Sequence, residues 1–286
     1  MKTINERVYH AKETGSIVPG FNVFGYEDAL AVVRAAERAD SPVLLMVNRD
    51  ARAVMDIRHW GALLESIARH AAVPVGVHLD HSTDAGAILQ AMESGFTSVM
   101  YDGSHLPIEK NIANSRGIVQ LAHQMGVAVE GEVGRVPYED MEDQQAFLTL
   151  PDEAKMLYEE SGVNWLAVSI GNVHRLTDRK VEIDFEQLAA IESVCTAPLV
   201  IHGASGISQD DIQRLKETRV AKINIGTVLR QTFGESLRRE FRAMPTAFDR
   251  LTLFKNPVKK VEEKAYELIT SLQFSERGVE NENTPG

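Results

Sequence analysis

Eight short runs rich in valine, isoleucine and leucine recur along the chain, and segments with helical periodicity separate them. The runs cover residues 17–23, 42–47, 73–79, 97–101, 127–133, 165–170, 199–201 and 221–225. Their apolar residues do not alternate with polar ones, which is typical of parallel strands buried on both faces. Helical patterns lie between them at 27–39, 57–70, 84–94, 107–125, 151–161, 185–193 and 209–217. This order predicts an α/β protein, a closed (β/α)8 TIM barrel.

The length of the chain agrees with one such barrel. It has 286 residues, and a (β/α)8 barrel needs about 250. We therefore expect a single barrel domain over residues 1–286, with extra C-terminal helices at 227–244 and 257–274 that pack outside the barrel. Residues 275–286 are polar, and we expect a flexible tail there.

The composition of the chain limits the classes of molecule that it is expected to bind. The formal net charge is −11, which argues against nucleic acid, because a nucleic-acid-binding protein normally needs a basic face. An anionic substrate would need local positive groups. No apolar run approaches the roughly 18 residues of a membrane span, and the N-terminus has no signal core, so we expect a cytoplasmic protein without a membrane partner. The one cysteine, Cys195, excludes an intrachain disulfide and reads as structural.

Three histidines stand at or just past the ends of predicted strands. They are His81, His174 and His202. Since strand C-termini converge on one face of a parallel barrel, we expect these imidazoles to meet there. Three imidazoles form an open zinc site whose fourth position is free for a substrate oxygen. Asp80 places a carboxylate next to one of these ligands.

Other titratable residues surround the predicted site. Glu132, at the end of the fifth strand, is either a fourth ligand or a partner behind the ligands. Glu130 reads equally well as a salt bridge inside the barrel mouth. His78 and Asp80 share one face of a regular strand, so His81 reaches the site only if that strand ends near Leu79. His78 is then a core histidine or a partner behind the ligands.

The last two strands end in turns typical of phosphate sites. In barrels such sites are built from backbone N–H groups and a helix N-terminus after strands seven and eight. Gly203 permits close approach of the backbone. The candidate donors or turn residues around it are Ser205, Asn224, Gly226 and Thr227. Ser104, after the fourth strand, is a further candidate substrate contact, whereas Asp102 and His105 read as braces of neighbouring loops.

Taken in order, these segments resemble class II, metal-dependent ketose-bisphosphate aldolases, the group of fructose- and tagatose-bisphosphate aldolases. The resemblance runs from Pro19 to about Arg230. It rests on His78-Leu-Asp-His81, Asp102-Gly-Ser-His105, Glu130-Gly-Glu132-Val-Gly-Arg135, Ile170-Gly-Asn-Val-His174, His202-Gly-Ala-Ser205 and Asn224-Ile-Gly-Thr227.

The resemblance implies an aldehyde-lyase that reversibly cleaves a phosphorylated ketose, a 1-phosphate or a 1,6-bisphosphate, to dihydroxyacetone phosphate and an aldehyde. It implies that His81, His174 and His202 hold a catalytic zinc that stabilises an enediolate, and that Asp80 exchanges a proton with the C4 hydroxyl. It further implies that the phosphate lies on Gly203, Ser205, Asn224 and Thr227, with Asn22 near the ketone. A monovalent cation, Na⁺ or K⁺, beside the phosphate and a homodimer or homotetramer are also implied.

The chain departs from the family pattern at several positions. Arg175 replaces a glycine after the second zinc histidine, and its guanidinium either clamps an anion, narrows the site or is solvated. Pro137 stiffens the loop that carries the family's proton-transferring glutamate, for which Glu139 and Asp140 are the candidates. Asn48 stands where the family has serine or threonine. No C-terminal arginine for a distal phosphate is evident, and Lys255 or Lys259 is the candidate substitute.

Four functional hypotheses remain at this point. The first is the zinc aldolase acting on a phosphorylated ketose. The second is a related aldolase for a differently acidic or non-phosphorylated ketose, with Arg175 contacting the acid group. The third is a non-catalytic subunit that kept the barrel, although no zinc histidine is lost. The fourth is a zinc-dependent hydrolase, against which the phosphate turns argue.

Overall fold

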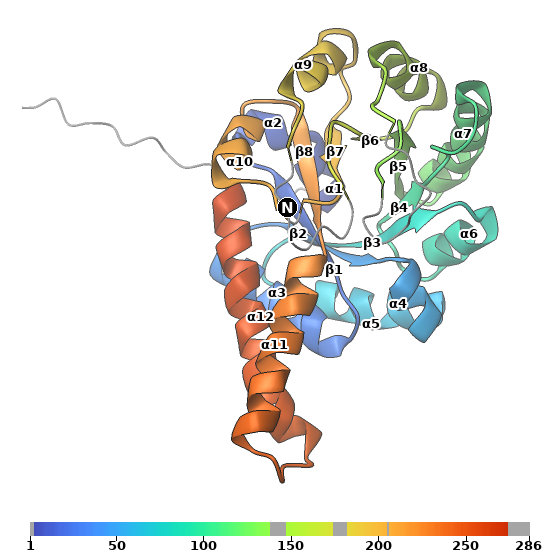
Figure 1. Ribbon diagram of the computed structural model, residues 1–286. Coiled ribbons are helices and arrows are strands. Elements are labelled where there is room, and N and C mark those ends of the chain that lie inside the picture. The colour runs from blue at the N-terminus through green and yellow to red at the C-terminus, as the bar shows by residue number, and fades with distance from the viewer. Residues whose placement is uncertain (1–2, 138–146, 174–181, 205, 274–286) are drawn as a thin grey trace, which may run out of the picture.

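The computed structural model describes residues 3–137, 147–173, 182–204 and 206–273. Its centre is a closed barrel of parallel strands in the order β1 to β8, with helices outside (Figure 1). The strands are β1 (Val18–Asn22), β2 (Val43–Val47), β3 (Val75–Ser82), β4 (Ser98–Tyr101), β5 (Ala128–Val133), β6 (Trp165–Val168), β7 (Leu199–Ile201) and β8 (Val220–Ile225). The predicted (β/α)8 barrel is confirmed.

Helices α3 to α10 join successive strands, whereas α1 and α2 precede β1 and α11 and α12 follow β8. The helices are α1 (Ile4–Tyr9), α2 (Ala11–Thr14), α3 (Tyr26–Arg38), α4 (Arg49–Val54), α5 (Ile57–Arg69), α6 (Ala85–Glu93), α7 (Ile108–Gln124), α8 (Pro151–Ser161), α9 (Phe185–Val194), α10 (Gln209–Leu215), α11 (Thr227–Ala243) and α12 (Arg250–Leu272). Their buried faces form one continuous apolar cluster with the outward faces of the strands. A separate apolar cluster, which includes Leu44, Met46, Met100 and Trp165, fills the lower interior of the barrel. The barrel is thus packed from within, and its chemistry is confined to the strand ends.

Helix α12 begins earlier than the sequence predicts. Proline is favoured in the first turn of a helix, which is why Pro257 reads as a start. In the structure Pro257 lies inside α12, and the helix begins after Asp249, whose Oδ2 accepts a hydrogen bond from the Thr252 amide at 2.9 Å. The short helices α1, α2 and α4 were also not predicted, because four to six residues show no full helical period.

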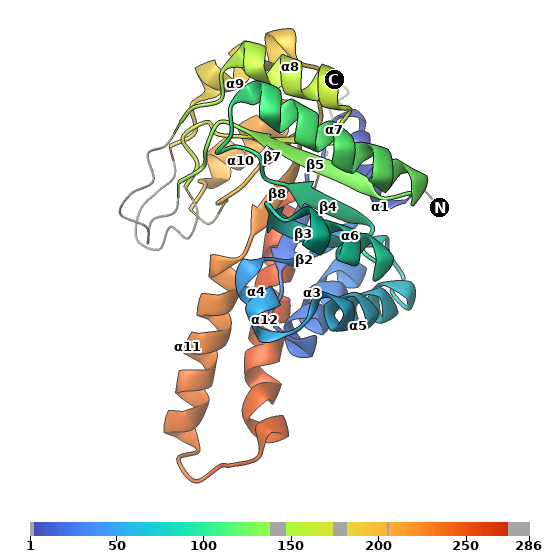
Figure 2. The ribbon, with the colours of Figure 1, turned by 90° about the vertical axis from the view of Figure 1, so that its right-hand side faces the viewer.

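Helices α11 and α12 lie side by side and project beyond the barrel (Figures 1 and 2). Both are tied to the helices around the barrel: Arg38 of α3 makes an ion pair with Glu262 of α12 at 3.0 Å, and Arg230 of α11 lies 3.6 Å from the Asp50 carboxylate of α4. The rings of Phe233 and Phe254 meet edge to face, with centroids 5.2 Å apart, and join α11 to α12. Among the described helices, none is both long enough and apolar enough to cross a membrane.

Candidate metal centre

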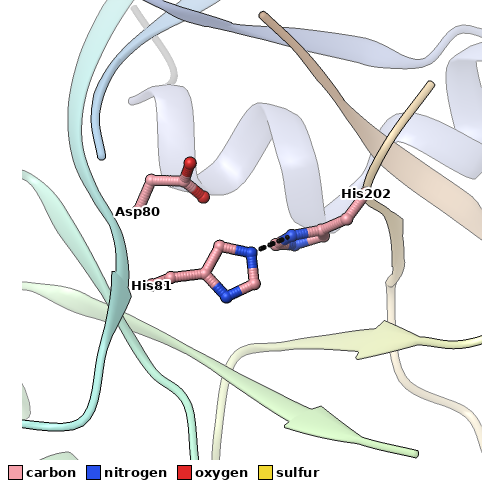
Figure 3. A group of neighbouring side chains, drawn as sticks. All are labelled: Asp80, His81 and His202. Atoms are coloured by element: carbon pink, nitrogen blue, oxygen red, sulfur yellow. Dashed lines mark hydrogen bonds between the residues drawn. The ribbon is translucent and has the colours of Figure 1, made fainter. Parts of the chain in front are cut away.

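The end of β3 brings Asp80 and His81 to the barrel mouth by a route the sequence did not predict. The strand does not end near Leu79 but continues to Ser82. Its register against β4 shifts between Leu79 and Ser82, and His81 has a φ of 43°. A left-handed residue interrupts the alternation of side chains. Two consecutive side chains, Asp80 and His81, therefore both lie beside His202 (Figure 3).

The hydrogen bonds of His81 and His202 define which nitrogen of each ring carries the proton. His81 Nδ1–H donates to Asp102 Oδ2 at 2.9 Å. His202 Nε2–H donates to Glu130 Oε1 at 2.7 Å. The remaining nitrogens, His81 Nε2 and His202 Nδ1, face each other at 2.8 Å. With these tautomers, both facing nitrogens present lone pairs.

Two imidazole lone pairs at this distance repel each other unless a proton or a cation lies between them. Burial and the neighbouring His81 hold the pKa of His202 well below its usual value, so His202 is neutral, the form that binds metals. One ligand atom each from Asp80, His81 and His202 lies within 4.8 Å of the others. These residues fit a divalent metal ion, with a carboxylate behind each imidazole as is usual for metal-binding histidines.

Asp80 is held in place as an ionised base. Its side chain is buried, and its two oxygens accept hydrogen bonds from Asn22 Nδ2 at 2.8 Å and Asn224 Nδ2 at 3.1 Å. Burial opposes its ionisation, but the neighbouring His81, His202 and Lys222, with the hydrogen bond from Asn22, outweigh burial and lower the Asp80 pKa. The predicted residues Asn22 and Asn224 therefore meet at Asp80.

Glu132 lies on the far side of His81. Its Oε2 is 3.6 Å from His81 Nδ1, the nitrogen that points away from His202. Burial, and then the charge of Asp102, raises the Glu132 pKa well above its usual value. His81, Asp102 and Glu132 form a second group whose geometry suits a metal. The position of Glu132 on the Nδ1 side of His81 favours a role in orienting this histidine over direct contact with a metal. Direct ligation by Glu132 stays a prediction.

A buried ion pair lies inside the barrel, and the sequence predicted only one of its two partners. Glu130 Oε2 accepts a hydrogen bond from Lys222 Nζ at 2.8 Å, and both side chains are fully buried. Lys222 Nζ also donates to Asn224 Oδ1 at 2.6 Å. The salt bridge expected for Glu130 is confirmed, but sequence reasoning missed Lys222. The available signal was a lysine in an apolar strand, two residues before Asn224 and therefore on the same face.

The sequence assigned Asp102 to the bracing of a neighbouring loop, but in the structure it contacts the candidate metal ligand His81. Besides His81, it accepts a hydrogen bond from Ser104 Oγ at 2.7 Å. Burial opposes its ionisation, but the hydrogen bonds from His81 and Ser104 outweigh burial and lower its pKa. Ser104, a predicted substrate contact, thus uses its hydroxyl proton on Asp102. His78, fully buried with Nδ1 at 2.9 Å from Ser98 Oγ, is a core histidine beneath the site.

The predicted phosphate turns lie at the ends of β7 and β8. Gly203 has a φ of 64°, a conformation that favours glycine. Gly226 packs closely against Asn22, where an added Cβ would lie 2.8 Å from Asn22 Oδ1. Thr227 opens α11, whose N-cap residue, Gly226, supplies no side-chain hydrogen bond to the first turn; the N–H groups of such a turn are suited to an anion.

Asn48, predicted to bind substrate, caps α4: its Oδ1 accepts a hydrogen bond from the Ala51 amide at 3.0 Å. Its contact with substrate stays a prediction. The substitute candidates Lys255 and Lys259 are exposed on α12. The residues outside the described part of the chain are Glu139, Asp140, His174, Arg175 and Ser205. Their assignments stay predictions.

Comparison with known proteins agrees with this geometry. Residues 2–277 match the family model of fructose-bisphosphate aldolase class-II. The YdjI aldolase from Escherichia coli K12 has a similar structure, with a TM-score of 0.84 and 31% identity over 95% of this chain and 97% of that one. A fructose-bisphosphate aldolase from Campylobacter jejuni shares the fold, with a TM-score of 0.82 and 20% identity over 95% of each chain.

Proposed function

Because the chain belongs to the class II fructose-bisphosphate aldolase family and is therefore a carbon–carbon lyase, we propose that it reversibly cleaves a phosphorylated ketose to dihydroxyacetone phosphate and an aldehyde. The observation that carries the proposal is the pair of facing imidazole nitrogens beside an ionised, buried Asp80. We propose zinc as the metal, held by His81, His202 and the predicted ligand His174. Nitrogen ligands in an open, three-histidine set are typical of catalytic zinc.

Cleavage requires a base and a positive charge at opposite ends of the breaking bond. Asp80 takes the proton of the C4 hydroxyl, the C3–C4 bond breaks, and its electron pair moves towards the C2 ketone to give an enediolate. A bound zinc ion supplies the positive charge that lowers the energy of this developing anion. The amides of Asn22 and Asn224 fix the Asp80 carboxylate, and such a positioned base contributes about 10²–10⁴-fold.

The phosphate of the dihydroxyacetone half is assigned to the turns after β7 and β8. The left-handed Gly203 exposes backbone there, and Thr227 begins a helix of 17 residues. Backbone N–H groups at a helix N-terminus attract a dianion. The protonation of C3 that completes the reaction is assigned to the predicted residues Glu139 or Asp140.

A coupled assay for dihydroxyacetone phosphate tests this function. The panel contains fructose and tagatose 1-phosphates and 1,6-bisphosphates, each measured with and without a chelator. Release from at least one substrate, abolished by the chelator and restored by zinc, is expected. No release from any phosphorylated ketose by zinc-loaded protein would overturn the proposal.

A further inference from the structure

The backbone conformation of His81 is unusual for a residue inside a strand. Its φ is 43°, and within the described part of the chain only one other residue besides the glycines, Asp40, has a positive φ. Asp40 lies in the turn after α3, where an aspartate tolerates this conformation. His81 lies in β3, and a residue with a Cβ keeps a left-handed backbone there only if its surroundings hold it.

Two contacts hold His81, one at its side chain and one at its backbone. The ring donates a hydrogen bond from Nδ1 to Asp102 Oδ2 at 2.9 Å. The carbonyl oxygen of His81 accepts a hydrogen bond from Arg52 Nη2, also at 2.9 Å. The first contact fixes the tautomer of the ring. The second fixes the direction of the carbonyl, and therefore the ψ angle of His81, with a charged and hence strong donor.

The backbone that carries Arg52 is itself fixed. Asn48 Oδ1 accepts a hydrogen bond from the Ala51 amide at 3.0 Å at the start of α4. The carbonyl of Ala51 accepts a hydrogen bond from Trp60 Nε1 at 3.0 Å, and the Trp60 side chain is buried. Arg52 therefore reaches β3 from a backbone that a helix cap and a buried tryptophan hold in place.

The position of the Arg52 guanidinium is costly in two ways. Its Nε is buried and, among the described residues, has no hydrogen-bond partner. Burial lowers the pKa of Arg52, against the charges of Asp80 and Asp84, which raise it. Arg52 and His81 also line one cavity of about 430 Å³, so a positive charge lies beside the site assigned to a cation and opposes cation binding. The bond to the His81 carbonyl is what this arrangement gains.

We propose that Arg52 is a positioning residue of the metal centre. Its guanidinium holds the carbonyl of His81, maintains the left-handed backbone, and so keeps His81 Nε2 turned towards His202 Nδ1 (Figure 3). The inference rests on the assignment of His81 as a zinc ligand in the proposed function. It concerns how tightly zinc binds, and it assigns to α4 a role in metal binding.

The test compares zinc affinities, measured by competition with a chromogenic chelator in the absence of substrate. Loss of a nearby positive charge alone makes zinc bind more tightly, whereas loss of the bond to the His81 carbonyl makes zinc bind more weakly. Arg52→Met should therefore bind zinc about 10-fold to 100-fold more weakly than the wild-type protein, the effect of one charge-assisted hydrogen bond. The opposite signs separate positioning from electrostatics.

Arg49→Met is the matched control. Arg49 belongs to the same helix and lines the same cavity, and its guanidinium lies 3.9 Å from the Asp50 carboxylate. The variant removes the same charge and leaves the bond to the His81 carbonyl in place, so its zinc affinity should equal or exceed that of the wild-type protein.

Arg52→Lys is the rescue variant. A lysine ammonium can donate to the His81 carbonyl, although without the reach of the guanidinium fork. Arg52→Lys should therefore bind zinc more tightly than Arg52→Met, even though it restores the positive charge. The reverse order would show that the charge of Arg52, and not its hydrogen bond, governs zinc affinity, and it would overturn the proposal.

A crystal structure of metal-free Arg52→Met gives a readout that is independent of zinc. His81 should leave the left-handed region, and its Nε2 should move away from His202 Nδ1. Arg52→Gln, whose amide is too short to reach the carbonyl, takes the place of Arg52→Met if circular dichroism shows that the latter does not fold.

Either of two results would contradict the role of Arg52: zinc binding by the neutral Arg52 variant as tight as by Arg49→Met, or an unchanged positive φ at His81. Because zinc affinity is measured without substrate, the proposed function fails separately. A protein that shows the expected order of zinc affinities but releases no dihydroxyacetone phosphate from any ketose would contradict only the proposed function.

Discussion

At the scale of single residues, the candidate centre depends on which nitrogen of each imidazole carries the proton. Asp102 and Glu130 each accept the proton of one histidine, and this leaves His81 Nε2 and His202 Nδ1 facing each other. A carboxylate behind a metal-binding histidine fixes both its tautomer and its orientation. The acidic partners are therefore as much a part of the centre as the histidines themselves.

The first prediction concerns Asp102. Asp102→Asn should weaken zinc binding by about 10-fold to 100-fold, since a neutral amide no longer enforces the Nδ1–H tautomer of His81. Competition with a chromogenic chelator measures the affinity. Asp56→Asn is the control, because Asp56 pairs with Arg58 on an exposed helix start. An Asp102→Asn protein that holds zinc as tightly as the control would show that the hydrogen bond has no such role.

The second prediction concerns the base. Asp80→Asn keeps the size of the side chain but removes its ability to take a proton, so kcat should fall by about 10²–10⁴-fold while zinc remains bound. Activity and metal content are measured on the same preparation. If the variant retained both its zinc and its wild-type turnover, Asp80 would have no part in proton transfer.

The third prediction concerns pH. Burial, and then the charge of Lys222, holds the pKa of His78 well below its usual 6.5. Below pH 6.5 the unfolded chain therefore binds a proton that the folded chain rejects, and the free energy of unfolding falls with falling pH, by about 1.4 kcal/mol per pH unit for this group. Glu132, whose pKa is raised, acts in the opposite direction, so the test is a difference between two proteins.

Denaturant unfolding of the metal-free wild-type protein and of His78→Gln between pH 7 and pH 5 measures that difference. As the pH falls, the free energy of unfolding should decrease more steeply for the wild-type protein than for His78→Gln. The difference in slope should reach up to about 1.4 kcal/mol per pH unit, which corresponds to one proton. Parallel curves for the two proteins would mean that His78 takes up its proton in the folded state.

At the scale of secondary-structure elements, β3, β5 and β8 contribute most of the centre, and their sequence signals differ. Most strand positions were predictable because apolar runs without alternation mark buried parallel strands. The direction of the His81 side chain was not predictable, because it depends on a register shift and a positive φ that no local sequence pattern encodes. The partner of Glu130 was also unpredictable, because Lys222 lies 92 residues away and only barrel closure brings the two together.

The fourth prediction concerns this β5–β8 contact. Lys222→Met leaves the Glu130 carboxylate buried without its cation, and it should lower the free energy of unfolding by about 3–5 kcal/mol. The double variant Lys222→Met, Glu130→Gln also removes the unpaired carboxylate charge. It should therefore recover part of the lost free energy of unfolding. Urea unfolding measures all three proteins. If Lys222→Met alone unfolded like the wild-type protein, the ion pair would contribute nothing to the barrel.

At the scale of the whole molecule, barrel closure brings residues from distant parts of the chain to opposite sides of one mouth. Glycine-rich turns and a helix start follow β7 and β8, and arginines follow β2 and β5. The sequence predicted the first set because phosphate turns have local signatures. It did not predict the second, because Arg49, Arg52 and Arg135 come together only when α4 and the end of β5 lie across the same cavity.

The measurement that tests the central claim most directly is a zinc titration of metal-stripped protein, with dihydroxyacetone phosphate release followed at each step. The account predicts no release without metal, and a linear rise that ends at one zinc per chain. A parallel titration of His202→Ala should show no rise at that stoichiometry. Full release by stripped wild-type protein, or an equal response from His202→Ala, would contradict the assignment of His81 and His202 as the metal centre of this aldolase.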